Sequence, residues 1–171
     1  MNNPVVKQVL RFILLLLLQV LVCNHVVLFG YINPNIYVLA ILLLPLNVPK
    51  SVQYIIAFAA GFFVDAFIQT FGVHASASLV LVALRPYVMK LLEINKKGDY
   101  KGVPVPGKKD LKFMVVYTVI LVFIHQLFVT MLEVFSFQGF FISLISILLN
   151  TLFTTVLVLC IQYIFTPEKK Q

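Results

Sequence analysis

Two charged side chains, Asp65 and Arg85, lie well inside apolar segments and are the first candidates for chemistry. A charge in the hydrocarbon core of a membrane is costly, so such residues usually face a protein interior or a water-filled cavity. Gly61 precedes Asp65 by four residues, which places both on one face of a helix. A direct ion pair between the two charges is one arrangement and separate partners are the other, and the sequence leaves both open.

The segment that follows Asp65 has its polar residues on one face as well. His74, Ser78 and Arg85 stand at positions i, i+4 and i+11, and Gly72 lies in the short connection before them. Small residues let helix backbones approach closely in lipid. We therefore expect Gly61 and Gly72 to shape a tight helical hairpin.

Two further polar stripes occur later in the chain. One stripe lies on a single face of the expected fifth helix and consists of Gln126, Thr130 and Glu133. The other follows the spacing i, i+3, i+7 and i+11 in the expected sixth helix and consists of Ser143, Ser146, Asn150 and Thr154. Packing between helices through buried hydrogen bonds is the simplest interpretation. The structural or partner-contact candidates are Gly61, Asp65, Gly72, His74, Ser78, Arg85 and Asn150.

The sequence contains no recognisable catalytic set. It has no HExxH, no GxSxG and no glycine-rich phosphate loop. His25, His74 and His125 fall toward the same end of the expected helices, but they lack acidic or cysteine partners at ligand spacing. We therefore expect no enzymatic activity, no catalytic residues, no bound metal and no cofactor.

The composition is that of an integral membrane protein. Hydrophobic residues make up 61% of the 171 residues and charged residues only 11%, against about 45–50% and about 25% in soluble domains. The mean hydropathy is +1.04. Most of the chain would be needed to cross a membrane several times, so we expect a single polytopic domain over residues 1–171.

The apolar runs and turn residues predict an all-α protein with about six transmembrane helices. The expected helices are 9–29, 35–47, 52–71, 75–92, 113–132 and 140–165, with a basic loop over 93–112. The second helix is short for a span, which needs about 20 residues. Pro45 and Pro49 flank its end, so a tilted, kinked or re-entrant segment is also compatible with the sequence.

The positive charges predict how the chain is oriented. Placing the N-terminus inside puts twelve of the 13 Lys and Arg residues on the cytoplasmic side, and Arg85 is the exception. Basic residues concentrate in cytoplasmic loops, and this bias sets the orientation of membrane proteins. The net charge of +7 is therefore interpreted as a topology signal rather than a nucleic-acid site, with both termini inside.

Several of these residues resemble a known family, the bacterial rod shape-determining protein MreD. The resemblance lies in Pro34 at the start of a short second helix, in the Pro45–Pro49 boundary, and above all in GFFVDAFIQTFGVHA over residues 61–75. There Gly61 and Asp65 match a Gly-x-x-x-Asp pattern, followed by a Gly-x-x-Ala pattern. The length, the six spans and the basic inner loop also fit, although the lysine-rich loop is longer than is usual in the family.

The resemblance implies a non-enzymatic scaffold of the cell-elongation machinery (the elongasome), located in the bacterial cytoplasmic (inner) membrane. Members of the family associate with MreC and, through it, with MreB, with a SEDS-family glycosyltransferase and with a class B penicillin-binding protein. They thereby help to organise peptidoglycan synthesis and to maintain cell shape. Their fold is similar to that of the S-components of energy-coupling-factor transporters.

Two other functions stay open. A vitamin-binding S-component or another small transporter would need a cavity with convergent polar groups, which His74, His125 and Asn150 could line. A lipid-contacting regulator would use the lysines of loop 96–112 to attract anionic headgroups of membrane lipids. The first helix, RFILLLLLQVLVCNHVV, has no pair of small residues of the kind that S-components use for docking.

Overall fold

Helices form nearly all of the chain that the structure describes. The computed structural model describes residues 4–25, 33–45, 48–93, 111–133 and 140–165. No strand occurs within these ranges. The helices are α1 (Pro4–Leu21), the 3-10 turn η1 (Cys23–His25), α2 (Tyr37–Leu42), α3 (Lys50–Ile68), α4 (Val73–Glu93), α5 (Leu111–Glu133) and α6 (Phe140–Phe165).

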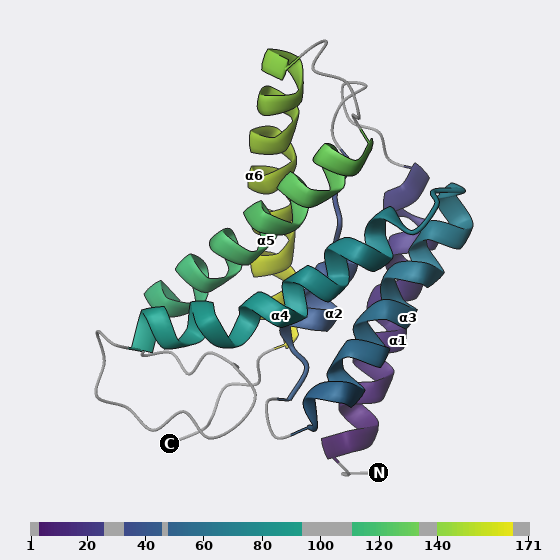
Figure 1. The fold of residues 1–171 in the computed structure, drawn as a ribbon. Helices are drawn as coiled ribbons and strands as arrows, with labels where there is room; N and C mark the ends of the chain where they lie inside the picture. Colours follow the sequence, from purple (N-terminus) through teal and green to yellow (C-terminus); the bar gives the residue numbers. More distant parts are fainter. Residues whose placement is uncertain (1–3, 26–32, 46–47, 94–110, 134–139, 166–171) are drawn as a thin grey trace.

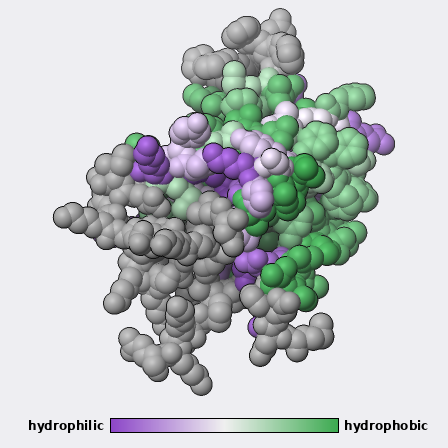
Figure 2. Space-filling model, turned by 60° about the horizontal axis from the view of Figure 1, so that its bottom comes forward, coloured by the Kyte–Doolittle hydropathy of each residue, from purple (hydrophilic) through white to green (hydrophobic). Residues whose placement is uncertain are grey.

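Four of these helices are long and apolar enough to cross a membrane. The qualifying segments are Lys50–Ile68, Val73–Leu92, Lys112–Glu133 and Ser143–Gln162. Only 33–44% of each segment is buried inside the bundle, and large apolar side chains cover much of the rest. In Figure 2 apolar residues cover one flank of the molecule and hydrophilic residues gather near the middle of the view. This surface suits a lipid environment, because lipid solvates exposed apolar side chains.

The expected boundaries agree closely with the structure for α3 to α6 and differ at the first two helices. Instead of spanning 9–29, α1 covers Pro4–Leu21 and is followed by the 3-10 turn η1. Instead of spanning 35–47, α2 covers only Tyr37–Leu42. A proline disfavours the helical conformation of the residue before it, and Pro45 follows the turn at Leu43 and Leu44. The end of the expected first helix after residue 25 and most of the lysine-rich loop, 94–110, lie outside the described residues.

The short helix α2 lies in the middle of the bundle, behind α4 in Figure 1. All six of its residues are buried. At about 1.5 Å per residue it is roughly 9 Å long, far less than the ~30 Å of a hydrocarbon core. Its ends therefore leave backbone groups inside the protein, and these groups need partners from other helices.

Arg85 of α4 supplies the partners at the C-terminal end of α2. Its Nη2 donates to the carbonyl oxygens of Leu42 and Leu44, at 3.0 and 2.7 Å. Its Nε donates to the Tyr117 hydroxyl at 3.1 Å, and its Nη1 to Oε1 of Gln53 at 3.4 Å. A cation is stabilised at a helix C-terminus by the helix dipole. The guanidinium, 1% exposed, thus has four oxygen acceptors and no carboxylate partner within the described part of the chain.

At Gly61 the backbones of α3 and α4 approach each other closely. A Cβ atom built at Gly61 would overlap the backbone carbonyl of His74 and would lie 2.6 Å from the Cα of Ala75. The connection between the helices turns through Gln69 and Gly72, which both have positive φ, 59° and 81°. Glycine adopts such angles at little cost. The hairpin therefore depends on a missing side chain at Gly61 and on a left-handed turn.

Replacing Gly61 with alanine should force α3 and α4 apart. The added methyl group meets backbone atoms, which cannot rotate away, so we expect the unfolding free energy to fall by about 1–3 kcal/mol. Reversible unfolding in mixed detergent micelles would measure the change. Ala59→Leu is the control, because Ala59 lies on the exposed side of α3. Equal stability of Gly61→Ala and the wild type would contradict the close approach.

Candidate functional site

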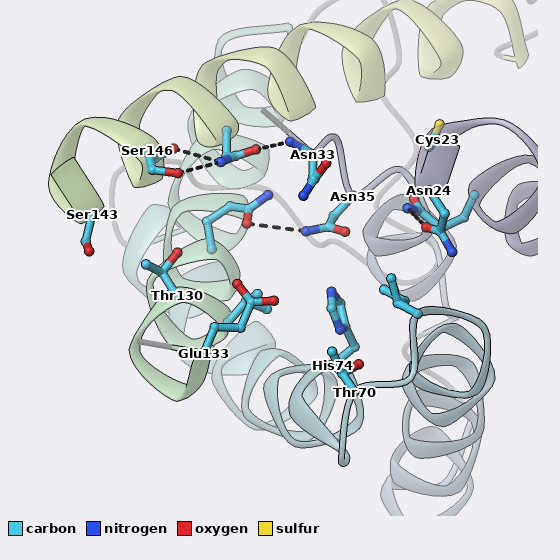
Figure 3. A pocket seen from close by; sticks show the side chains of 15 residues that line it. Cys23, Asn24, Asn33, Asn35, Thr70, His74, Thr130, Glu133, Ser143 and Ser146 are labelled. Carbon is cyan, nitrogen blue, oxygen red and sulfur yellow. Dashed lines mark hydrogen bonds between the residues drawn. The ribbon is translucent and has the colours of Figure 1, made fainter. Parts of the chain in front are cut away.

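A polar cavity of about 410 Å³ opens at the end of the bundle where α3 turns into α4. This is the upper end of the molecule in Figure 1. Side chains from η1, from the segment before α2, from the α3–α4 turn and from α5 and α6 surround it (Figure 3). Elements distant in sequence therefore meet at one hydrogen-bonding surface, within a bundle that is otherwise largely apolar.

Asp65 holds the wall of this cavity in place. Its Oδ1 accepts hydrogen bonds from the Thr70 hydroxyl at 2.5 Å and from the backbone N–H of His74 at 3.0 Å. Its Oδ2 accepts from the backbone N–H of Ala75 at 2.9 Å. These N–H groups belong to the first turn of α4, which has no intrahelical acceptor for them. The carboxylate thus caps α4 from the preceding helix, where the helix dipole favours an anion.

The same carboxylate orients His74 toward the cavity. Oδ1 of Asp65 lies 3.1 Å from Nδ1 of His74, and both side chains are buried. A carboxylate accepts, so this contact places the ring proton on Nδ1 when the imidazole is neutral. Nε2 is then an acceptor. His74 lines the cavity, and its ring extends toward Asn35 in Figure 3.

A buried cluster of rings lies directly beneath His74. The Tyr37 hydroxyl is 2.6 Å from Nε2 of His125 and accepts a 3.3 Å hydrogen bond from the Ser78 hydroxyl. The ring centroids of Tyr37 and His74 are 6.0 Å apart. His125 and Ser78 are buried but do not line the cavity. This cluster fixes α2 against α4 and α5.

Amide side chains make up much of the polar lining: Gln19, Asn24, Asn33, Asn35, Gln126 and Asn150. Gln19 anchors the start of α2, because its Oε1 accepts from the Tyr37 N–H at 3.2 Å and its Nε2 donates to the Pro34 carbonyl at 3.2 Å. Nε2 also donates to Oδ1 of Asn24 at 2.8 Å. The short helix is therefore held at both ends by side chains from other segments.

The polar stripe of α6 binds the segment before α2. Oδ1 of Asn150 accepts from the Asn33 N–H at 2.7 Å, and the Thr154 hydroxyl accepts from the Asn35 N–H at 3.2 Å. Gln126 of α5 accepts from Nδ2 of Asn35 and donates to Thr154, both at 3.3 Å. The polar stripes of α5 and α6 therefore join helices, as expected, and also form part of the cavity wall.

Hydroxyl groups and one carboxylate complete the polar lining. Thr70, Thr130, Ser143 and Ser146 contribute hydroxyls, and Glu133 contributes the carboxylate. Glu133 is exposed at the rim and lies beside Thr130 in Figure 3. Among the described residues that line the cavity, none is a lysine or arginine. The lining is therefore neutral to negative and rich in fixed hydrogen-bonding groups.

Six of the seven residues singled out in the sequence gather around this end of the α3–α4 hairpin or line the cavity: Gly61, Asp65, Gly72, His74, Ser78 and Asn150. Arg85 does not join them. It is ten residues beyond Ala75 on α4, about 15 Å along the helix at 1.5 Å per residue. Since each charge has its own partners, the direct Asp65–Arg85 pair that the sequence left open does not form.

Sequence reasoning missed several residues of the site. Gln19 and Asn24 stand alone in a leucine-rich run, and Tyr37 lies in the short second helix. Asn33 and Asn35 flank Pro34, a pattern that on its own indicates only a turn. The number of amide side chains within apolar segments could have indicated the site, because buried amides need hydrogen-bond partners.

Comparisons with known proteins leave the function to be argued from this geometry. No family model matches the chain, and neither curated proteins nor solved structures provide a match.

Replacing Asp65 with asparagine should destabilise the hairpin, although the two side chains have nearly the same shape. An amide has one acceptor oxygen and would direct its NH₂ group at N–H donors, leaving buried groups unpaired. We expect the unfolding free energy to fall by about 2–4 kcal/mol. Ser76→Ala is the control, since it removes only a local hydroxyl bond to the Val73 carbonyl. An Asp65→Asn protein as stable as Ser76→Ala would exclude the capping role.

Proposed function

We propose that this protein is a non-enzymatic membrane scaffold of the bacterial cell-elongation machinery, of the MreD type. The observation that carries the proposal is the structure of the stretch 61–75, where the resemblance to that family is strongest. Gly61 and Asp65 join α3 and α4 into one tightly packed unit. A rigid hairpin of this kind suits a protein whose task is to present a fixed surface to partners.

The outer face of α3 is the surface that we assign to the partner MreC. Ile55, Phe58 and Phe62 follow the spacing i, i+3 and i+7, and they are 66%, 47% and 57% exposed. The rings of Phe58 and Phe62 stack with centroids 5.9 Å apart. A stripe of large, stacked side chains on a braced helix provides a shape into which a single transmembrane helix can pack.

The proposed setting is the bacterial cytoplasmic membrane. Four helices suited to crossing a membrane support the membrane location. Six spans with both termini inside, and an indirect association through MreC with MreB, with the SEDS-family glycosyltransferase and with the class B penicillin-binding protein, belong to the same proposal.

Two triple-alanine variants test the scaffold. Replacing Ile55, Phe58 and Phe62 should abolish co-purification with MreC and the rod shape of cells that depend on this protein, because the stripe supplies the packing surface. The control is Ile145, Leu148 and Leu152 of α6, which have the same spacing and are 58%, 55% and 60% exposed. Equal loss in both variants, or in neither, would contradict the assignment to α3.

The cavity favours one second candidate, a substrate-binding S-component of a vitamin transporter. His74 and Asn150 line the cavity as that function would require, whereas His125 lies beneath it. The absence of a small-residue pair in α1 argues against docking on an energy-coupling module. Recovery of such a module in place of MreC in a mild-detergent pull-down would select this alternative.

A further inference from the structure

We propose that the polar cavity is a binding site for a small, uncharged or cationic molecule rich in hydroxyl and amide groups. The proposal rests on the lining of the cavity and not on the scaffold function. A cavity of about 410 Å³ falls in the usual range of small-molecule sites, roughly 300–1,000 Å³.

The arrangement of the amides indicates more than packing. Amide side chains that serve only to join helices satisfy one another, as Asn35 and Gln126 do in part. The Nδ2 of Asn24, in contrast, is buried without a hydrogen-bond partner among the described residues, although its Oδ1 is bonded to Gln19. An unpaired buried donor is costly. Asn24 lines the cavity, so a turn of its amide that lets a ligand oxygen reach Nδ2 would be favourable.

The lining also has acceptors available. Nδ1 of His74 donates its hydrogen bond to Asp65, so Nε2 is the acceptor that remains at the cavity wall. Asn35 uses its Nδ2 for Gln126, and no hydrogen bond to its Oδ1 is found in the described segments. Ligand hydroxyl or amide N–H groups can donate to these atoms. The donors and acceptors are already fixed by internal hydrogen bonds, which lowers the entropic cost of binding.

The charge of the lining selects among ligands. Glu133 contributes a carboxylate, and the described lining residues include no lysine or arginine. An anionic ligand such as a phosphate would meet repulsion without a counter-charge. A ligand with an ammonium group would gain from Glu133, and a neutral polyol or amide would bind through the amides alone. We therefore assign the site to neutral and cationic ligands, whether free or attached to a lipid.

Three probes with one sugar ring test this assignment: glucosamine, N-acetylglucosamine and N-acetylglucosamine 1-phosphate, which are cationic, neutral and anionic. Binding to the detergent-purified protein is measured by ligand-induced thermal stabilisation and by calorimetry. We expect saturable binding of the first two and at least tenfold weaker binding of the third. Native mass spectrometry of protein released from its own membrane gives the mass of any retained ligand, and that mass separates a lipid-linked molecule from a free one.

Two variants locate the binding. Glu133→Gln should weaken glucosamine binding about two- to fivefold and leave N-acetylglucosamine binding unchanged. Thr130→Tyr should abolish both, because the larger side chain fills the cavity from α5. Val116→Tyr is the matched control, since Val116 lies on the exposed side of α5. All variants are first checked for an unchanged unfolding transition in the absence of ligand.

Several results would overturn the proposal. One is failure of both the neutral and the cationic probe to bind, together with no retained mass in the native spectrum. Tighter binding of the phosphate is another. Binding that survives Thr130→Tyr would place the site elsewhere. Loss of MreC co-purification in the α3 variants tests the scaffold separately, because those residues do not line the cavity.

Discussion

The carboxylate of Asp65 is the group on which the architecture of this end of the protein depends. It accepts hydrogen bonds from two backbone N–H groups of α4, from a threonine hydroxyl and from an imidazole. The two N–H groups have no other acceptor in the first turn of α4, and leaving them unpaired would cost about 1–3 kcal/mol apiece. One side chain thus caps a helix, closes the turn and orients His74, and the shape of the cavity follows from all three.

Arg85 has the complementary function about midway along α4. The short helix α2 ends inside the protein, and its last carbonyl oxygens would be unpaired without the guanidinium. An anion therefore stands at a helix N-terminus and a cation at a helix C-terminus, each where the helix dipole favours it. Neither charge needs the other. This separation lets one end of the bundle form a polar cavity while the centre holds the short helix α2.

Local patterns in the sequence predict much of this fold. Runs of apolar residues, with glycine and proline between them, give α3 to α6 to within about three residues of their observed ends. The spacing of Gly61 and Asp65 indicates a close hairpin. The extent of α2 was wrong in the prediction, because its length is set by Pro45 and by partners distant in the chain, Gln19 and Arg85. The cavity was considered only as a requirement of the transporter alternative. Its lining could not be predicted, since Asn24, Asn33 and Asn35 come together through tertiary contacts that no periodicity records.

A double-mutant cycle of Asp65→Asn and Arg85→Gln tests the central claim that the two buried charges are stabilised independently by helix ends. The free energies of unfolding of the wild type, both single variants and the double variant are measured in the same mixed micelles. Independent sites give additive changes within about 0.5 kcal/mol, and that is the predicted result. A coupling energy above about 1 kcal/mol would show that the two charges stabilise each other and would contradict the account.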